Sequence, residues 1–143
     1  MLTNQELTAL LRNHGYKVTP QRLAVYEALA EQPWHPNAET LYKKLQPKYP
    51  AMSFATVYKT VEILRDIKVI QILNAGEDSY RYDANMHEHY HLCCTECGII
   101  LDVPMDKVIR EQLNSLVQSQ GGFLVTGGQF YFYGLCSKFQ KLH

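Results

Sequence analysis

The chain has 143 residues, 46% of them hydrophobic, and its 14 Lys and Arg residues balance 14 Asp and Glu residues. This length allows one ordinary domain or two small ones around a real apolar core. The chain lacks the strongly basic balance of many nucleic-acid-binding proteins, so DNA binding must be argued from pattern. No apolar run approaches the roughly 20 residues of a membrane span, and no secretory signal opens the sequence. We therefore expect a cytoplasmic protein.

Four helices followed by a hairpin are predicted for the first half of the chain. Each predicted helix begins directly after a residue that is favoured as an N-cap. These residues are Thr3, Thr19, Asn37 and Ser53. Gly15 is the expected end of the first helix. Residues 69–73 and 79–83 flank a turn with Gly76 and are predicted as the two strands. Short helices closed by a hairpin are typical of winged-helix domains, and this order favours DNA binding despite the neutral charge.

The fourth predicted helix, from Phe54 to about Arg65, is the candidate recognition helix. Its predicted core face holds Phe54, Val57, Val61 and Leu64. The opposite face holds Ala55, Thr56 and Lys59, with Tyr58 at its border. Small and polar groups on the first turns suit entry into a major groove. Judged from this helix alone, a solvent-exposed face without a DNA-binding role is the better interpretation.

A small α+β unit is predicted for the second half. A strand through the histidines pairs with 99–103, and a helix capped by Asp106 runs to Gly121. Segments 123–126 and 129–135 are predicted as two further strands joined at Gly127 and Gly128. Open strand edges commonly pair between subunits, which agrees with a homodimer.

The stretch 87–97 holds three of the six histidines and three of the four cysteines. His89 and His91 point to the same face of a strand, because side chains alternate with a period of two. This pair favours a metal site even in isolation. Cys94 and Cys97 have the C-x-x-C spacing that brings two thiolates to one ion. One segment therefore offers both a nitrogen-rich and a sulfur-rich site.

Three motifs carry a resemblance that spans nearly the whole chain. They are Val-Thr-Pro-Gln-Arg at 18–22, Met-Ser-Phe-Ala-Thr-Val-Tyr at 52–58, and His-Tyr-His at 89–91 followed by Cys94-x-x-Cys97. In this order and spacing they resemble the ferric uptake regulator (Fur) family of dimeric, metal-dependent transcriptional repressors. The resemblance implies an α+β fold with a winged-helix DNA-binding domain at 1–84 and an α/β dimerisation domain at 85–143. It also implies a metal site at the junction and a pseudo-palindromic double-stranded DNA operator.

The resemblance implies specific DNA contacts. Lys17 matches a residue that approaches the minor groove, and Tyr58 matches one that contacts bases from the recognition helix. Ser53, Thr56 and Lys59 of the same helix complete the expected DNA-binding set. Lys59 is a departure, since peroxide-sensing members often carry Asn there, and Lys contacts phosphate or guanine differently. The operator sequence therefore stays open.

Within the family, the ligand positions are most similar to the peroxide-sensing branch. The matching residues are His35, Asp83, His89, His91 and Asp102. Asp102 is the informative one, because iron-responsive members usually carry Glu there. Alone, His35 or Asp83 would more often be a cap or a surface residue. Nitrogen and oxygen ligands suit one Fe(II) or Mn(II) per subunit, with Zn(II) binding in vitro.

The peroxide-sensing branch implies a mechanism. Fe(II) in the site reacts with hydrogen peroxide, a histidine ligand is oxidised, and the repressor leaves DNA after the metal is lost. By position the oxidation-sensitive residues are His35 and His89. One alternative is an iron- or manganese-responsive uptake regulator with the same ligands. A non-haem iron enzyme is disfavoured by the order of elements and by the lack of a substrate-pocket signature, so we expect no enzyme.

The cysteine motif departs from the family pattern of two C-x-x-C pairs. Phe139 stands where the last cysteine belongs, which leaves the thiols of Cys94, Cys97 and Cys136. Closed structural zinc sites take four ligands. The sequence therefore argues against a structural zinc. Cys93 is expected to be a buried apolar residue. Aromatic residues are expected to pack the region instead, namely Phe130, Tyr131, Phe132, Tyr133 and Phe139.

Overall fold

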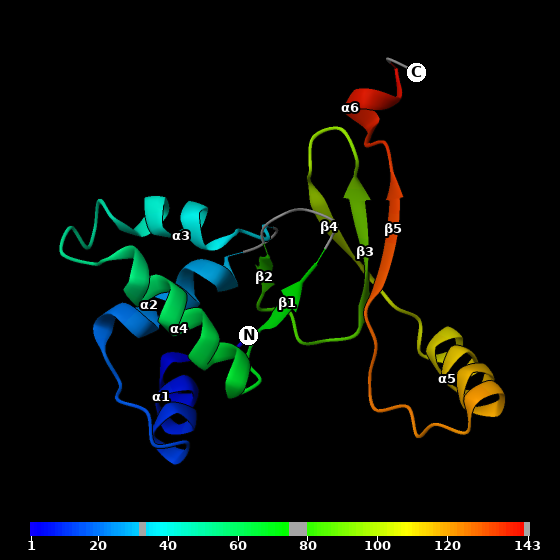
Figure 1. Ribbon diagram of the computed structural model, residues 1–143, viewed down its shortest axis with the longest axis horizontal. Coiled ribbons are helices and arrows are strands. Elements are labelled where there is room, and N and C mark those ends of the chain that lie inside the picture. Colours follow the sequence, from blue (N-terminus) through cyan, green and yellow to red (C-terminus); the bar gives the residue numbers. More distant parts are fainter. Residues whose placement is uncertain (32–33, 75–79, 142–143) are drawn as a thin grey trace. The chain divides into compact units, whose positions relative to one another are not determined.

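The computed structural model describes residues 1–31, 34–74 and 80–141, and the chain divides into two compact units, Met1–Met86 and His87–His143 (Figure 1). The described residues of the first unit form four helices and then a two-stranded antiparallel sheet. These elements are α1 (Asn4–Asn13), α2 (Pro20–Ala30), α3 (Ala38–Leu45), α4 (Phe54–Asp66), β1 (Gln71–Leu73) and β2 (Arg81–Asp83). The predicted order of helices before hairpin is confirmed. None of the described helices is long and apolar enough to cross a membrane.

Local capping chemistry sets where each of the four helices begins. The side chains of Thr3, Thr19, Asn37 and Ser53 each accept a hydrogen bond from the backbone N–H three residues further on. Thr3 and Glu6 form the complete reciprocal capping box. Gly15 follows the end of α1 with a φ of 77°, which glycine adopts without steric cost. All four predicted caps are confirmed.

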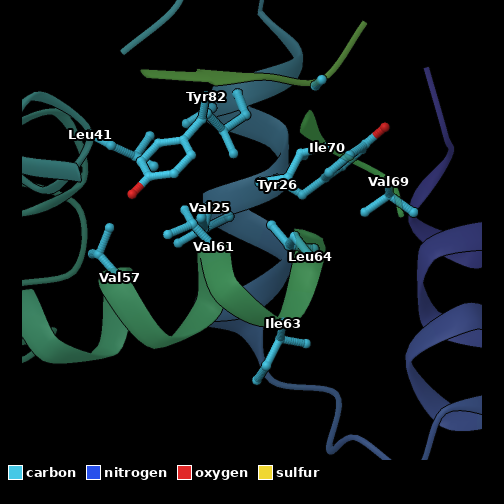
Figure 2. Close-up of a cluster of buried hydrophobic side chains, with 14 of the residues drawn as sticks. Val25, Tyr26, Leu41, Val57, Val61, Ile63, Leu64, Val69, Ile70 and Tyr82 are labelled. Atoms are coloured by element: carbon cyan, nitrogen blue, oxygen red, sulfur yellow. The ribbon is translucent and has the colours of Figure 1, made fainter. Parts of the chain in front are cut away.

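The core of the first unit lies between α1, α2, α3 and α4, with Tyr82 of β2 packed into the same cluster (Figure 2). Val57, Val61 and Leu64 of α4 are buried there, as predicted. The prediction for Phe54 is wrong, since this side chain is 45% exposed. As the first residue of α4, Phe54 projects back toward the helix N-terminus and beyond the core. Its ring instead meets Tyr42, with centroids 5.9 Å apart.

The hairpin of the first unit is shorter than predicted. Strand β1 begins at Gln71, because Val69 and Ile70 are buried against the helices and do not pair with β2. The described part of β2 begins at Arg81. The predicted turn at Gly76 and the first predicted strand residue, Ser79, lie outside the described residues.

The second unit contains a three-stranded sheet in the order β4-β3-β5. Its elements are β3 (His89–Cys94), β4 (Ile100–Pro104), α5 (Lys107–Gly121), β5 (Phe130–Gly134) and α6 (Ser137–Gln140). Strand β3 pairs antiparallel with β4 and parallel with β5. The predicted strand at 123–126 is wrong, and Phe123 and Leu124 are 73% and 83% exposed. A parallel return to β5 needs a connection that crosses over from α5, and these residues supply it.

Exposed apolar side chains characterise the second unit. Helix α5 carries an apolar stripe, and none of its residues is buried. Its exposed side chains are Val108, Ile109, Leu116 and Val117. Leu92, Leu101, Val103 and Phe132 of the sheet are also exposed. Large apolar side chains that are exposed in such number commonly mark an interaction site.

Candidate metal centre

Three predicted ligands come together on the strand pair β3–β4. His89 and His91 lie two residues apart on β3 and face the same way, and the antiparallel register places Asp102 opposite His91. Both histidines are buried. The His89 Nε2 atom lies 2.9 Å from His91 Nε2 and 3.2 Å from Asp102 Oδ1. The distance from His91 Nε2 to Asp102 Oδ1 is 3.7 Å.

These distances fit the coordination of a metal ion. An ion with bonds of about 2.1 Å separates neighbouring ligand atoms by about 3.0 Å in an octahedron and about 3.4 Å in a tetrahedron. The three observed separations, 2.9, 3.2 and 3.7 Å, span this range. Two imidazoles and one carboxylate also form the donor set that suits Fe(II) and related divalent ions.

The surroundings of the two histidines favour the ligand role. His89 Nδ1 lies within hydrogen-bond distance of the His87 carbonyl oxygen. In the tautomer with its proton on Nδ1, His89 donates to this carbonyl and its Nε2 lone pair faces the cluster. Metal-binding histidines are commonly held in this way. His91 is flanked by Tyr131 of β5, whose ring stacks on the imidazole with centroids 5.2 Å apart.

The other two predicted ligands, His35 and Asp83, meet inside the first unit. They are far apart in sequence, but Tyr82 N donates to the Pro36 carbonyl at 2.9 Å, and the Arg81 side chain donates to the His35 carbonyl. These bonds join the segment before α3 to β2. His35 Nε2 consequently lies 3.7 Å from Asp83 Oδ2, with both side chains buried.

The Asp83 carboxylate is held by two further groups. Its Oδ1 accepts a hydrogen bond from Asn85 N at 2.8 Å, and its Oδ2 accepts one from Gln71 Nε2 at 3.1 Å. A buried carboxylate is costly unless it is hydrogen-bonded and paired with a cation or a polar hydrogen. The arrangement therefore fixes one carboxylate beside one imidazole, and each unit holds its own part of the predicted ligand set.

A second cluster of potential ligands lies at the other end of β3. The Sγ atoms of Cys94, Cys97 and Cys136 all lie within 4.8 Å of one another. Cys94 and Cys97 flank the turn from β3 to β4, and Cys136 is the N-cap residue of α6. Thr95 N donates to the Gly134 carbonyl at 2.9 Å, which ties this turn to the end of β5. Helix α6 and the β3–β4 turn lie at the same end of the sheet (Figure 1).

The three thiols have the spacing of a zinc site, and the Cys94 thiol is acidic. Zn–S bonds of about 2.3 Å place the sulfurs of a tetrahedral site about 3.8 Å apart. Cys97 Sγ and Cys136 Sγ are separated by 3.8 Å. The backbone N–H of Cys136 donates to Cys94 Sγ at 3.4 Å and, with the Cys97 N–H, lowers the pKa of the Cys94 thiol to about 6. A thiol with this pKa is largely the metal-binding thiolate at neutral pH.

The expectation that aromatic residues occupy this region in place of a metal site is wrong. Phe132 and Tyr133 are 57% and 58% exposed, and the three thiols converge instead. The C-x-x-C spacing alone does not reveal this convergence, because the parallel strand β5 returns Cys136 to a turn 39 residues away. Cys93, by contrast, is buried, as predicted.

The predicted DNA-binding residues lie on two parts of the first unit. Lys17 is exposed in the turn before α2, and its carbonyl accepts a hydrogen bond from the Arg22 guanidinium. Ser53 caps α4, and Thr56, Tyr58 and Lys59 follow on its first turns; Tyr58 is 46% exposed.

A groove of about 270 Å³ lies between the start of α2 and the first turns of α4. Thr19, Gln21 and Arg22 from the start of α2 line one side, and Thr56 and Lys59 of α4 line the other. The position of Arg22 was missed at the sequence level, although Val18–Arg22 was singled out as a motif. Two cations beside a helix N-terminus form a setting that suits a phosphate group.

Comparisons with known proteins identify the family. The model of the ferric uptake regulator family matches residues 13–133. The peroxide-responsive repressor PerR of Staphylococcus epidermidis is 36% identical over 134 residues, which cover 94% of this chain and 88% of that protein. The Campylobacter jejuni peroxide stress regulator has 33% identity and a TM-score of 0.75, over 93% of this chain and 98% of its own. GAS PerR-Zn-Zn has 30% identity and a TM-score of 0.53, over 94% and 85%.

This chain belongs to the ferric uptake regulator family, so the resemblance seen in its motifs is confirmed. Members of the family are metal-dependent transcriptional regulators that bind DNA operators and dimerise, and the chain is such a regulator, not an enzyme. Within the family its similarity is to PerR.

Proposed function

We propose that the chain is a peroxide-sensing repressor that binds a pseudo-palindromic DNA operator as a homodimer when it carries Fe(II) or Mn(II). The observation that carries the proposal is the convergence of His89 Nε2, His91 Nε2 and Asp102 Oδ1 at 2.9 to 3.7 Å. The pairing of His35 with Asp83 in the first unit supplies two further ligands of suitable type. The similarity to PerR of Staphylococcus epidermidis and to the Campylobacter jejuni peroxide stress regulator supports the peroxide response.

One ion held by all five side chains would act as the regulatory switch. His35 and Asp83 belong to the unit that carries α4, whereas His89, His91 and Asp102 belong to the unit that carries the sheet. An ion shared by both units can bind only when the units are oriented so that the ligands of the first unit meet the ligands of the second. It therefore shifts the population toward that orientation, in proportion to its difference in affinity for the two states. In this proposal the metal-bound orientation is the one that binds DNA.

Oxidation of a ligand would reverse the switch. Fe(II), when bound, would supply a redox-active ion at which hydrogen peroxide is reduced. His35 and His89 are the side chains that would be oxidised: a C–H bond of the imidazole would be replaced by a C–O bond, and the second peroxide oxygen would leave as water. The oxidised ring is a poorer donor, so the remaining side chains hold the ion less tightly. Mn(II) in the same ligand set supports DNA binding with little of this chemistry.

The exposed face of α4 is the proposed DNA-reading surface. Ser53, Thr56, Tyr58 and Lys59 occupy its first turns, which enter the major groove in helix-turn-helix proteins. Lys17, in the turn before α2, is placed by the proposal at the minor groove. The exposed apolar stripe of α5 and the open edge of β5 are the proposed dimer surfaces. The proposal includes a cytoplasmic location, where the operator is accessible.

A structural zinc at the three-thiol cluster is part of the proposal. The spacing of Cys97 Sγ and Cys136 Sγ and the acidity of Cys94 support it. The similarity to GAS PerR-Zn-Zn also supports it. Because Phe139 is not a ligand, the chain supplies three thiolates and leaves one coordination position to water or another small donor.

Operator binding under controlled redox conditions tests the proposal. The protein is titrated anaerobically against its promoter DNA after loading with Fe(II) or Mn(II), each with and without hydrogen peroxide. We expect both metals to support binding and peroxide to abolish it only in the Fe(II) sample. Binding that needs metal but survives peroxide with Fe(II) would instead identify an iron- or manganese-responsive uptake regulator.

A further inference from the structure

Tyr131 forms one wall of the histidine cluster. The parallel register of β3 and β5 pairs it with His91. The two rings stack with centroids 5.2 Å apart and planes inclined at 23°. The Tyr131 hydroxyl donates to Gln129 Oε1 at 2.7 Å, which holds the ring in this position. An electron-rich phenol therefore lies directly against a proposed metal ligand.

The other tyrosines of the sheet differ in their distance from the cluster. Tyr133 stacks on Tyr131 with centroids 6.4 Å apart, so it is one ring further from His91. Tyr90 lies between the two histidines in sequence and therefore points to the opposite face of β3, where it meets Phe130 and Phe132. Among the described tyrosines of this sheet, Tyr131 is the one stacked on a proposed ligand.

We propose that Tyr131 is a second oxidation site of the sensor, hydroxylated to a catechol when peroxide is reduced at Fe(II) in the histidine cluster. The inference rests on the proposed function. In the balanced step, one ring C–H bond beside the phenol hydroxyl is replaced by C–OH. The ring is oxidised by two electrons, the peroxide O–O bond is cleaved, and the second oxygen leaves as water with the displaced hydrogen. Iron ends the step as Fe(II).

Two features direct the oxidant to this ring. Two imidazoles and a carboxylate form the ligand set that non-haem iron oxygenases use for oxygen insertion. The stacked phenol is an oxidisable neighbour that is not itself one of the five proposed ligands. Its hydroxylation therefore consumes peroxide and leaves the ligand set intact. Tyr131 competes with His35 and His89 and sets how much peroxide is needed to release the repressor.

Mass spectrometry of the full-length protein tests this inference. Anaerobic Fe(II)-loaded protein receives a limited amount of hydrogen peroxide and is digested and sequenced by fragmentation. We expect one added oxygen on Tyr131, which reacts in a catechol-specific redox stain, and none on Tyr90. Mn(II)-loaded protein should show neither modification. Equal oxidation of Tyr131 and Tyr90 would mean attack from bulk solvent and would overturn the inference.

Variants separate oxidation from a packing role. In Tyr131→Phe the stacked ring is kept, and oxygen insertion should convert the phenylalanine into a tyrosine. In Tyr131→Leu the modified peptide should be lost, and the oxidised fraction of the histidine peptides should rise at the same peroxide dose. Tyr133→Phe is the matched control and should change neither yield. Mn(II) affinity and circular dichroism establish that each variant keeps its fold and its site.

The same samples distinguish the two proposals. If the histidines gain oxygen and DNA is released while Tyr131 stays unmodified, the peroxide-sensing function stands and the role of Tyr131 is refuted. If no residue gains oxygen and DNA stays bound, the proposed function itself fails. An unchanged histidine yield in Tyr131→Leu would also contradict the competition.

Discussion

Phe139 is the single residue that most sets the cysteine cluster apart from the four-thiolate pattern. It lies on α6, three residues after Cys136, where a cysteine would complete two C-x-x-C pairs. The three thiols already converge without it. We therefore expect the residue at position 139 to affect how tightly a zinc ion is held, and not whether the three thiols come together.

Phe139→Cys should slow the loss of zinc to a chelator. A fourth thiolate closes the coordination shell, and structural zinc sites are closed. We expect zinc release from the variant to be at least about 10-fold slower, the effect typical of a change in a metal site's supporting groups. Release is followed with a chromogenic chelator. Phe139→Ser is the matched control, since it removes the ring without adding a thiolate, and equal release rates for all three proteins would contradict the prediction.

Lys59 lines the groove with Arg22 and Thr19, which favours a phosphate contact for its ammonium group. Lys59→Ala should therefore weaken operator binding similarly across sequences. The slope of log K against log salt should become shallower by about 0.9 for each phosphate that the variant no longer neutralises. The measurement is a salt titration of operator affinity by fluorescence anisotropy.

Lys43→Ala on α3 is the control, because Lys43 is exposed and paired with Glu39 at 2.9 Å. Its salt slope should match that of the parent protein. If Lys59→Ala keeps the parent slope but changes which base is preferred, Lys59 reads a base edge and the phosphate assignment is wrong.

At the scale of elements, α4 depends on its cap for both stability and position. Ser53 Oγ accepts a hydrogen bond from Thr56 N at 3.1 Å at the turn proposed to enter the groove. Ser53→Ala should lower the free energy of unfolding by about 1 kcal/mol. Urea denaturation measures the loss. Ser53→Asp restores a cap and should recover most of that stability, whereas equal instability of both variants would assign another role to Ser53.

The apolar stripe of α5 makes a prediction about assembly. Leu116 and Val117 are 58% and 53% exposed on a helix with no buried residue. Leu116→Glu should shift the protein from dimer to monomer in sedimentation velocity, because a charge replaces apolar area proposed to be covered by the partner. Gln118→Glu on the same helix adds the same charge at a polar position and should leave the dimer intact. A dimeric Leu116→Glu protein would remove α5 from the interface.

The sequence predicts helix starts well, because they depend on interactions between residues that are close in the chain. Thr19 and Ser53 mark helix starts because a cap acts within three residues. Phe54 was misplaced because a helical stripe does not show where the core ends. Segment 123–126 resembles a strand in composition, yet its residues serve as the connection to a parallel strand.

The part of the metal site that depends on local spacing could also be predicted from the sequence. His89 and His91 follow from the strand period, but the approach of His35 to Asp83 depends on the bond from Tyr82 N to Pro36 O, which no spacing reveals. The family resemblance alone brought that pair into the ligand set. The stack of Tyr131 on His91 and the return of Cys136 to the β3–β4 turn both depend on the tertiary register.

The proposed switch is one ion that takes ligands from both units of the chain. Each unit holds part of the set, with His35 beside Asp83 in the first and the cluster of His89, His91 and Asp102 in the second. A shared ion couples metal occupancy to DNA affinity, and the coupling is reciprocal, so operator DNA must tighten metal binding by the same factor.

The shared ion can be tested by measuring Mn(II) binding to the full chain by electron paramagnetic resonance, with and without operator DNA. We predict one high-affinity ion per subunit, tightened by DNA. Both His35→Ala and His91→Ala should lose that ion and the effect of DNA, while His87→Ala keeps both. If His35→Ala binds Mn(II) as tightly as the parent protein and still responds to DNA, the ion is held by the second unit alone and the shared-ion switch is wrong.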